Sequence, residues 1–299
     1  MGALHLAAAC TELPTDLAAA VAEGDAAHPC RDMASFRAHL LQTVDAPDRS
    51  VVEAWHPPRP VARAARPFVE AMARRYMKEC GGHETVELTQ QLIAFGTVST
   101  QQSPHDGADF KTMAAFLREW SRKANLRFDV FGNNDAWEVS FGAGPRNLAF
   151  VAHADVVPPG TGWTRSPFKA EILDGKLYGR GAEDDKGPLA AALVAMRTLA
   201  VTGLPPPGRL TTIIGTGEEN DWIGMERYVR ATPRARTTLS LDADFPVTVA
   251  ENGLVAWHLG APMSSTTARP TRPRILEARA GDLLTQVPST ATAVIKPGV

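Results

Sequence analysis

The stretch Phe150–Leu193 constrains the fold of this chain more than any other part of the sequence. An apolar run ends there at His153 and Asp155, and a glycine-rich turn further along leads into Asp184 and Asp185, where an alanine-rich helix begins. An imidazole and several carboxylates at the ends of core elements are typical of a metal site on an α/β scaffold. If this stretch forms a metal site, the remaining segments should supply its other ligands.

Strand-like and helical patterns alternate through the middle of the chain. The run 147–152 is apolar throughout, as in a strand that is buried on both faces. The alternation predicts an α/β fold with a largely parallel mixed sheet and helices on both faces. The periodicity predicts strands at 126–131, 136–141, 147–152, 210–214, 239–241 and 247–251, a hairpin at 172–178, and helices at 15–24, 33–44, 61–79, 85–95, 108–124, 187–199 and 222–230.

Composition excludes several classes of partner. The 31 basic and 33 acidic residues give a formal net charge of -2, so neither nucleic acid nor an anionic membrane is expected as a partner. No apolar run is long enough to span a membrane. The apolar start MGALHLAAAC is either an ordinary N-terminal segment, with a cytoplasmic location as the default, or a clipped lipoprotein signal, with a periplasmic one. Three widely spaced cysteines argue against a disulfide framework.

Ionisable side chains stand at the ends of four core elements, where the functional groups of a parallel sheet belong. These groups are His153, Asp155, Asp184, Asp185, Glu218, Glu219, Asp242 and Asp244. Carboxylates that are brought together repel one another and lose hydration, and a divalent cation relieves both costs. One imidazole with several carboxylates suits Zn, Mn or Co, and the number of carboxylates favours two bridged ions over one.

Other catalytic chemistries have no support in the sequence. No Gly-x-Ser-x-Gly element is present, and no cysteine lies near a plausible base. The glycines around Gly179 and Gly215 lack the Lys-Ser/Thr pair of a phosphate-binding loop. Cys80 and His83 have the spacing of two zinc ligands, but they lack the flanking turns of a zinc finger.

Four motifs in order resemble the di-zinc metallopeptidase family of ArgE/DapE, carnosinase and PepV-type dipeptidases. They are His153-Ala-Asp-Val-Val-Pro158 with Trp163 and Pro167-Phe168, Gly175–Gly187, Gly215-Thr-Gly-Glu-Glu219 and Asp242-Ala-Asp-Phe-Pro246. The resemblance runs from about Thr85 to Gly253, and Asp242–Pro246 with Glu251-Asn-Gly253 is closest to the PepV-like branch. It implies a zinc-aminopeptidase-like catalytic domain.

The resemblance also implies metal ligands. His153 and Asp242 match ligands of a first ion, Glu219 matches a ligand of a second ion, and Asp184 matches the carboxylate that bridges the two. Two divalent ions are therefore expected, with Zn favoured and Mn or Co as alternatives.

The resemblance implies two further roles. Glu218 matches the general base, which takes a proton from a metal-bridging water and passes it to the leaving amine. Asp155 matches the carboxylate that orients His153 by accepting its other N–H. Asp185 is expected to lie outside the ligand set, and Arg180 and Lys186 are expected to balance acidic charge. In the family, the peptide bond that follows the bridging aspartate is often cis.

The resemblance ends before the family pattern is complete. The second ion lacks one protein ligand, which in the family is a distant downstream histidine, and His258 follows Asp242 too closely to match it. The segment Gly281–Pro288 resembles the start of the family's lid domain. We expect a helical extension with a proline-rich linker over 1–60, the catalytic domain over 61–260, and an irregular tail with the start of the lid over 261–299.

Two classes of function follow from these motifs. The first is a metal-dependent hydrolase of a peptide or amide bond in a small substrate, a dipeptide before an N-acyl amino acid. The second is a truncated, non-catalytic metal-binding remnant or interaction module, because one ligand and the lid are missing from the pattern. The oligomeric state is left open, since family members often dimerise through the lid.

Overall fold

The computed structural model describes residues 11–12, 30, 32–44, 46–59, 65–99, 107–243, 248–250, 273–281 and 290–297. Its residues divide into two compact units, 1–243 and 244–299, which are treated separately below. Several expectations lie outside the described residues: the helix at 15–24, the N-terminal apolar segment with Cys10, Asp244, His258, most of the tail 261–274, and the lid-like segment after Gly281. The predicted domain limits at residues 60 and 260 stay predictions.

The first unit is built on a five-stranded sheet in the order β2-β3-β7-β4-β8. Strand β3 runs antiparallel to both of its neighbours, the edge strand β2 and β7, whereas β7, β4 and β8 run parallel to one another. Their bounds are Arg127–Phe131 for β2, Ala136–Phe141 for β3, Arg146–His153 for β4, Arg209–Gly215 for β7 and Thr237–Ser240 for β8. The predicted mixed α/β sheet is confirmed, and the parallel strands are those whose ends carry the acidic motifs.

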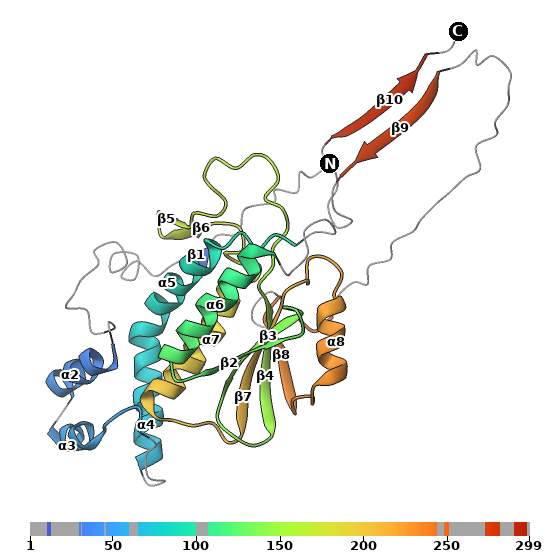
Figure 1. Ribbon diagram of the computed structural model, residues 1–299. Coiled ribbons are helices and arrows are strands. Elements are labelled where there is room, and N and C mark those ends of the chain that lie inside the picture. The colour runs from blue at the N-terminus through green and yellow to red at the C-terminus, as the bar shows by residue number, and fades with distance from the viewer. Residues whose placement is uncertain are drawn as a thin grey trace. The chain divides into compact units, whose positions relative to one another are not determined.

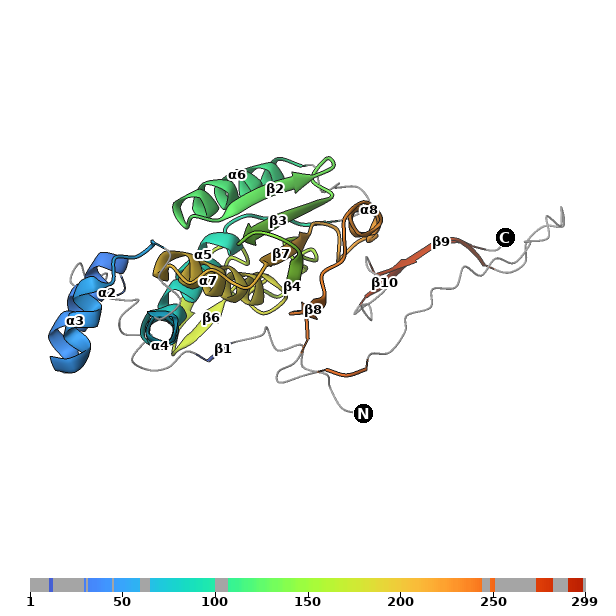
Figure 2. The same ribbon diagram turned by 90° about the horizontal axis from the view of Figure 1, so that it is seen from below.

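Helices cover both faces of this sheet, as predicted (Figures 1 and 2). On one face, α6 (Ala108–Lys123) and α7 (Lys186–Thr202) form the main core with Trp137 and Val139 of β3. On the other face, α8 (Ile223–Ala231) packs through Met225 and Tyr228 against the small residue Ala136, also of β3. The alternating side chains of one strand thus serve two separate helical layers.

The helical region before α6 differs from the expectation. Two separate helices were predicted at 61–79 and 85–95, with Gly81 and Gly82 between them, but α4 (Arg66–Tyr76) continues through a π-helical turn (Met77–Gly81) directly into α5 (Gly82–Ile93). Both glycines have helical backbone angles. A Cβ atom on Gly81 would lie 2.6 Å from Cε of Met77. The glycine therefore gives room to a neighbouring side chain, which sequence rules for helix ends do not capture.

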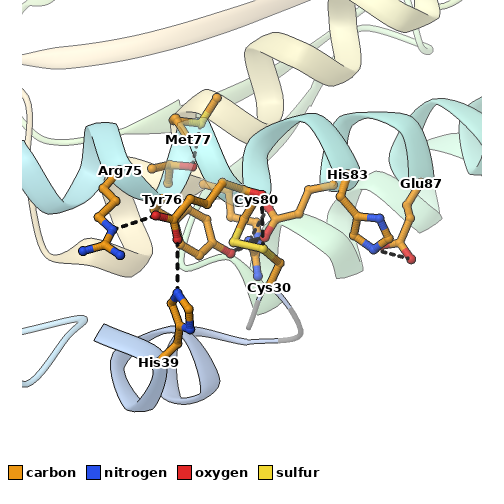
Figure 3. Close-up of a disulfide and its surroundings, with 12 residues drawn as sticks. Cys30, His39, Arg75, Tyr76, Met77, Cys80, His83 and Glu87 are labelled. Carbon is orange, nitrogen blue, oxygen red and sulfur yellow. Dashed lines mark hydrogen bonds and ion pairs between the residues drawn. A yellow bond between two sulfur atoms is a disulfide. The ribbon is translucent and has the colours of Figure 1, made fainter. Parts of the chain in front are cut away.

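A disulfide joins the N-terminal helices to this region (Figure 3). The helices α2 (Met33–Thr43) and α3 (Ala46–Ala54) belong to a second apolar cluster, in which Phe36 and Trp55 pack with Val69 of α4. Cys30 pairs with Cys80 in the π-helical turn. The expectation drawn from the odd cysteine count is wrong here, because helix packing brings two distant cysteines together. The same bond removes Cys80 as a zinc ligand.

Smaller elements complete the description. The predicted hairpin forms as β5 (Glu171–Leu173) and β6 (Lys176–Tyr178), and β1 (Thr11–Glu12) pairs with β6. In the second unit, β9 (Arg274–Ala280) and β10 (Ala291–Lys296) form an antiparallel pair. The strand expected at 247–251 is absent from its described residues 248–250. Within the part of the chain that is described, no helix is both long and apolar enough to cross a membrane.

Candidate metal centre

Three parallel strands end side by side and bring distant acidic motifs to one edge of the sheet. His153, the last residue of β4, lies in register with Gly215 at the end of β7. The turn after Gly215 carries Glu218 and Glu219, and Asp242 follows the end of β8, the other neighbour of β4. This arrangement arises because the carboxyl ends of parallel strands share one sheet edge.

Carboxylates surround the Nε2 side of the His153 imidazole. This nitrogen lies 2.9 Å from Oδ1 of Asp184 and 3.8 Å from Oδ2 of Asp242. Two sets of possible ligand atoms each lie within 4.8 Å: one from His153, Glu218 and Asp242, and one from His153, Asp184 and Glu219. All five predicted ligand and base residues are thus brought together. These two sets share residues with the ligand sets expected for the two ions, but they are not identical to them. The assignment of ligands to each ion therefore stays a prediction.

The buried side chain of Asp155 connects two of these strands. Its two carboxylate oxygens accept hydrogen bonds from the backbone N–H groups of Glu218, at 3.1 Å, and Glu219, at 3.0 Å. The Nδ1 atom of His153 lies 2.8 Å from the backbone oxygen of Asp155 and 3.5 Å from its Oδ1. The hydrogen-bond partner of Nδ1 is thus the backbone oxygen of Asp155, and the orienting role expected of its carboxylate stays a prediction. The carboxylate also fixes the turn that holds both glutamates, which the sequence did not indicate.

The start of α7 is hydrogen-bonded to the backbone of His153. Asp185 is fully buried, and its Oδ2 accepts a hydrogen bond of 2.9 Å from the backbone N–H of His153. The Asp184–Asp185 peptide bond is cis, as the resemblance implied. Lys186 is also buried, and its Nζ donates to the backbone oxygen of Phe95 at 2.7 Å. A Cβ atom on Gly187 would lie 2.2 Å from the backbone oxygen of Ala182, so only glycine permits this tight entry into the helix.

A short segment after α5 braces the loop that follows β4. The Thr97 hydroxyl donates to the backbone oxygen of Ala154 at 2.6 Å, and its own backbone oxygen accepts from the N–H of Val156. Both bonds hold the backbone on either side of Asp155. Sequence reasoning missed this brace, because a threonine in an apolar loop has no pattern that distinguishes it.

Burial and mutual repulsion shift the protonation of the cluster. Burial raises the pKa of Glu218 to about 7 and that of Glu219 to about 7, and the neighbouring Asp242 and Asp184 carboxylates add to the two shifts respectively. Burial also raises the pKa of Asp185 to about 7. In the opposite direction, its hydrogen bond with His153 lowers the pKa of Asp184.

The imidazole responds to the surrounding negative charge. Burial opposes a charged ring, but hydrogen bonds with Asp155 and Asp184 raise the pKa of His153 to about 12. A single proton on this imidazole thus compensates part of the repulsion. Coordination of a cation would replace that proton, because a ligating histidine must be neutral.

The donor set fits divalent metal ions. It combines one imidazole nitrogen with carboxylate oxygens of four residues, the ligand types that Zn, Mn and Co accept. One carboxylate oxygen beside the cluster, Oδ1 of Asp185, is buried and has no hydrogen-bond partner among the described residues. A nearby cation stabilises the ionised form of carboxylates whose pKa values are raised. A bound metal ion would therefore neutralise this centre more effectively than protons do.

Comparison with known proteins agrees with this geometry. Residues 149–266 match the model of the peptidase family M20/M25/M40. This segment of the chain is therefore similar to peptidase family M20/M25/M40. The resemblance inferred from the four motifs is confirmed, since the matched M20 segment contains His153, Asp184, Glu218, Glu219 and Asp242.

Curated relatives of this chain are longer than the chain itself. The putative dipeptidase YtjP of Bacillus subtilis (strain 168) is 40% identical over 215 residues, which cover 70% of this chain and 45% of YtjP. The Beta-Ala-Xaa dipeptidase of Lactobacillus delbrueckii subsp. lactis is 37% identical over 157 residues, covering 52% and 33% of the two chains. The chain thus spans less than half the length of these relatives.

Among solved structures, human carnosine dipeptidase 1 superposes on this chain with a TM-score of 0.45 and 24% identity, covering 57% of this chain and 38% of the human one.

Proposed function

We propose that this chain is a metal-dependent hydrolase that cleaves the peptide bond of small substrates, dipeptides in the first place. The observation that supports this most strongly is the cluster of His153 with four carboxylate residues at the ends of parallel strands. The match to the M20 family and the two dipeptidase relatives support the same reaction.

The ligands in this proposal are those that the resemblance implies. His153, Asp184 and Asp242 would hold one divalent ion, and Asp184 and Glu219 a second, with Zn favoured and Mn or Co as alternatives. When bound, such ions supply Lewis-acid polarisation of the scissile carbonyl and neutralise the carboxylates around them. The short approach of Asp184 to His153 supports a shared ligand position, because both side chains already face one point.

Glu218 is the proposed general base. Attack of a water oxygen on the carbonyl carbon forms a C–O bond, and the C–N bond breaks as the amine leaves. Glu218 takes the proton from the water and returns it to the amine nitrogen. Burial in the metal-free chain raises the pKa of Glu218, which makes its carboxylate a stronger base. The hydrogen bond from its backbone N–H to Asp155 holds the base in place.

The test uses the full chain loaded with Zn or Mn. We expect hydrolysis of dipeptides that a chelator abolishes, and we expect Glu218→Gln to lower kcat by about 100- to 10,000-fold. Glu226→Gln is the matched control, because Glu226 lies on the exposed surface of α8 and pairs with Arg230. Hydrolysis that is indifferent to both chelator and Glu218→Gln would sink the proposal.

Substrate comparison separates two chemical classes. Dipeptides and N-acyl amino acids share an amide bond and a carboxylate but differ in the charged amino group. We expect a higher kcat/KM for dipeptides. A higher value for N-acyl amino acids would instead make the chain a deacylase, and tight metal binding without turnover on either class would make it a non-catalytic metal-binding module.

A further inference from the structure

The side chain of Lys186 is fully buried beside the candidate metal centre, and the proposed reaction does not use it. Lys186 begins α7 directly after the Asp184–Asp185 pair, and none of its surface is exposed. Its Nζ donates to the backbone oxygen of Phe95, but that oxygen also accepts the backbone N–H of Thr97 at 2.9 Å. The oxygen would therefore stay paired without the lysine. Because burial of an amine costs free energy that an apolar side chain of similar length does not incur, packing alone does not explain a lysine here.

The glycine turn before α7 leaves space for the lysine stem. A Cβ atom on Gly181 would lie 3.0 Å from Cδ of Lys186 and 3.1 Å from Cγ1 of Val156. The backbone oxygen of Gly181 also accepts the backbone N–H of Lys186 at 3.0 Å. The stem is thus packed against this turn, which also contacts the loop after β4, and it carries Nζ from α7 to Phe95.

The segment that accepts the lysine, Phe95–Thr97, is itself attached to the loop after β4. The Thr97 hydroxyl donates to the backbone oxygen of Ala154 at 2.6 Å, and the Thr97 backbone oxygen accepts the N–H of Val156 at 3.0 Å. Val98 and Val156 also form a parallel bridge. The position of Phe95–Thr97 is therefore fixed by that loop.

Three segments around the metal centre are thereby connected in pairs. Lys186 connects the start of α7 to Phe95–Thr97, and Thr97 connects that segment to the loop after β4. The third connection is Oδ2 of Asp185, which accepts the backbone N–H of His153 at 2.9 Å. A closed set of connections restrains relative position more than an open one, because a displacement of one segment strains two connections at once. Such support from residues outside the ligand set is what keeps a metal site in one geometry.

Two of the proposed ligands belong to the connected segments: Asp184 precedes α7 and His153 ends β4, with 2.9 Å between Oδ1 and Nε2. We propose that Lys186 is a positioning residue, which holds Asp184 in place opposite His153 for a shared metal ion by connecting α7 to Phe95–Thr97. Groups outside the ligand set tune metal affinity in this way, by orienting the ligands. This inference rests on the metal centre of the proposed function, but it does not require turnover.

The experiment measures Zn affinity by titration calorimetry and the visible absorption spectrum of the Co-loaded full chain, which depends on the arrangement of the ligands. We expect Lys186→Met to lower Zn affinity by about 10- to 100-fold and to change the Co spectrum. Thr97→Val should give a smaller loss, because its backbone bond to Val156 remains, whereas Thr97→Ser keeps the hydroxyl and should match wild type. Lys111→Met and Thr112→Val are the matched controls on the exposed surface of α6, and they should change neither measurement.

The double variant Lys186→Met with Thr97→Val tests whether the connections act together. We expect its loss of Zn affinity to be close to that of Lys186→Met alone, because Thr97 restrains α7 through the lysine. Two independent supports would instead multiply their losses. A multiplied loss, or a folded Lys186→Met variant with the Zn affinity and Co spectrum of wild type, would overturn the proposal.

Urea denaturation of the metal-free variants separates positioning from general stability. We expect Lys186→Met to unfold at a urea concentration close to that of wild type, because the lost hydrogen bond is offset by the removed cost of burying the amine. If Zn affinity fell only in proportion to stability across the variants, Lys186 would be a structural residue and the proposal would be wrong. If Lys186→Met does not fold, the Thr97 variants decide: a lower affinity in Thr97→Val than in Thr97→Ser supports positioning, and equal affinity contradicts it.

Metal binding and turnover together separate this inference from the proposed function. Zn binding with the expected losses but without dipeptide hydrolysis leaves the positioning role standing and refutes the hydrolase. Dipeptide hydrolysis with wild-type Zn affinity in Lys186→Met refutes the positioning role alone. A wild-type chain that binds no Zn refutes both.

Discussion

Two clusters of ionisable groups lie toward opposite ends of α7, and they are neutralised in different ways. The Glu84 cluster consists of Glu84, Tyr76 and Arg197, the last of which belongs to α7. Nη1 of Arg197 lies 2.5 Å from both carboxylate oxygens of Glu84, and the Tyr76 hydroxyl donates to the same carboxylate. At the other end, the candidate metal centre gathers four carboxylate residues around one imidazole.

The difference distinguishes a structural cluster from a ligand site. The Glu84 carboxylate has its own cation, so the chain neutralises it without help. The carboxylates of the metal centre share one histidine, and the pKa values of Glu218 and Glu219 are raised because burial is not compensated. A surplus of clustered negative charge is therefore the physical indication of a cation site, whereas a carboxylate paired with its own cation is not.

Removal of the cation from the Glu84 cluster should have the largest effect on stability. In Arg197→Met, Glu84 stays buried without its partner, and we expect the free energy of unfolding to fall by about 3–5 kcal/mol. Urea denaturation of the metal-free chain measures this. The double variant Glu84→Gln with Arg197→Met should recover most of the loss. If Arg197→Met alone were as stable as the double variant, Arg197 would not be needed to neutralise Glu84, and the proposed difference between the two clusters would be wrong.

Loss of the disulfide should have the next largest effect, and it should be confined to the Glu84 side of the molecule. Cys30 and Cys80 are separated by 50 positions in the sequence, and a crosslink over such a loop restricts the unfolded chain. We expect Cys30→Ser with Cys80→Ser to lower the free energy of unfolding by about 2–4 kcal/mol. Cys10→Ser serves as the control. Zn affinity should be unchanged, and a parallel loss of Zn affinity would show that the two regions are coupled.

Substitution of Asp155 tests the metal centre through a residue that is outside the proposed ligand set. In Asp155→Asn, one carboxylate oxygen becomes an N–H₂ group that cannot accept the backbone N–H of Glu218 or Glu219. We expect Zn affinity to fall by about 10- to 100-fold in titration calorimetry. Asp129→Asn is the control, because Asp129 pairs with Arg127 on the exposed surface. Unchanged Zn affinity in Asp155→Asn would contradict the positioning role.

The smallest expected effect is a pH dependence of the metal-free chain. Because folding raises the pKa of Glu218, Glu219 and Asp185 to about 7, the folded chain binds more protons than the unfolded chain between about pH 4.5 and 7. Stability should therefore fall as pH rises through this window. The raised pKa of His153 continues the same trend above about pH 6.5.

Thermal melts measure this dependence with and without metal. In chelator, we expect Tm to fall by a few degrees, on the order of 2–4 °C, from pH 5.5 to 7.5. With Zn, the stabilisation should grow over the same range, because the ligands bind metal in their deprotonated forms. A Tm in chelator that rises with pH would contradict the assignment of uncompensated negative charge to the metal centre.

The strand-end residues of the candidate site could be predicted because their position depends on topology alone. Once 147–152 and 210–214 are assigned as parallel strands, His153 and Glu218 must lie at the same sheet edge. The side-chain geometry could not be predicted in this way. The carboxylate of Asp155 contacts two backbone N–H groups 63 and 64 positions away, and only the folded turn determines that orientation.

The errors have a common cause in tertiary packing. The helices 61–79 and 85–95 were predicted as separate, with Gly81 in the break between them, but the helical backbone continues and the Met77 side chain occupies the space that the glycine leaves. The Cys30–Cys80 pair was not expected because a cysteine count contains no distances. In both cases a contact between segments decided the outcome against a local rule.

The Cys30–Cys80 bond makes the attachment of α2 and α3 depend on the cellular compartment. Protein disulfides persist in the periplasm and outside the cell, whereas cytosolic thiol systems reduce them. In an oxidising compartment these helices are held covalently to the π-helical turn. In a reducing one they are held by the packing of Phe36 and Trp55 and by the hydrogen bond from Trp55 to Thr202. A protease that cuts only detached helices would therefore report the redox state in which the chain was made.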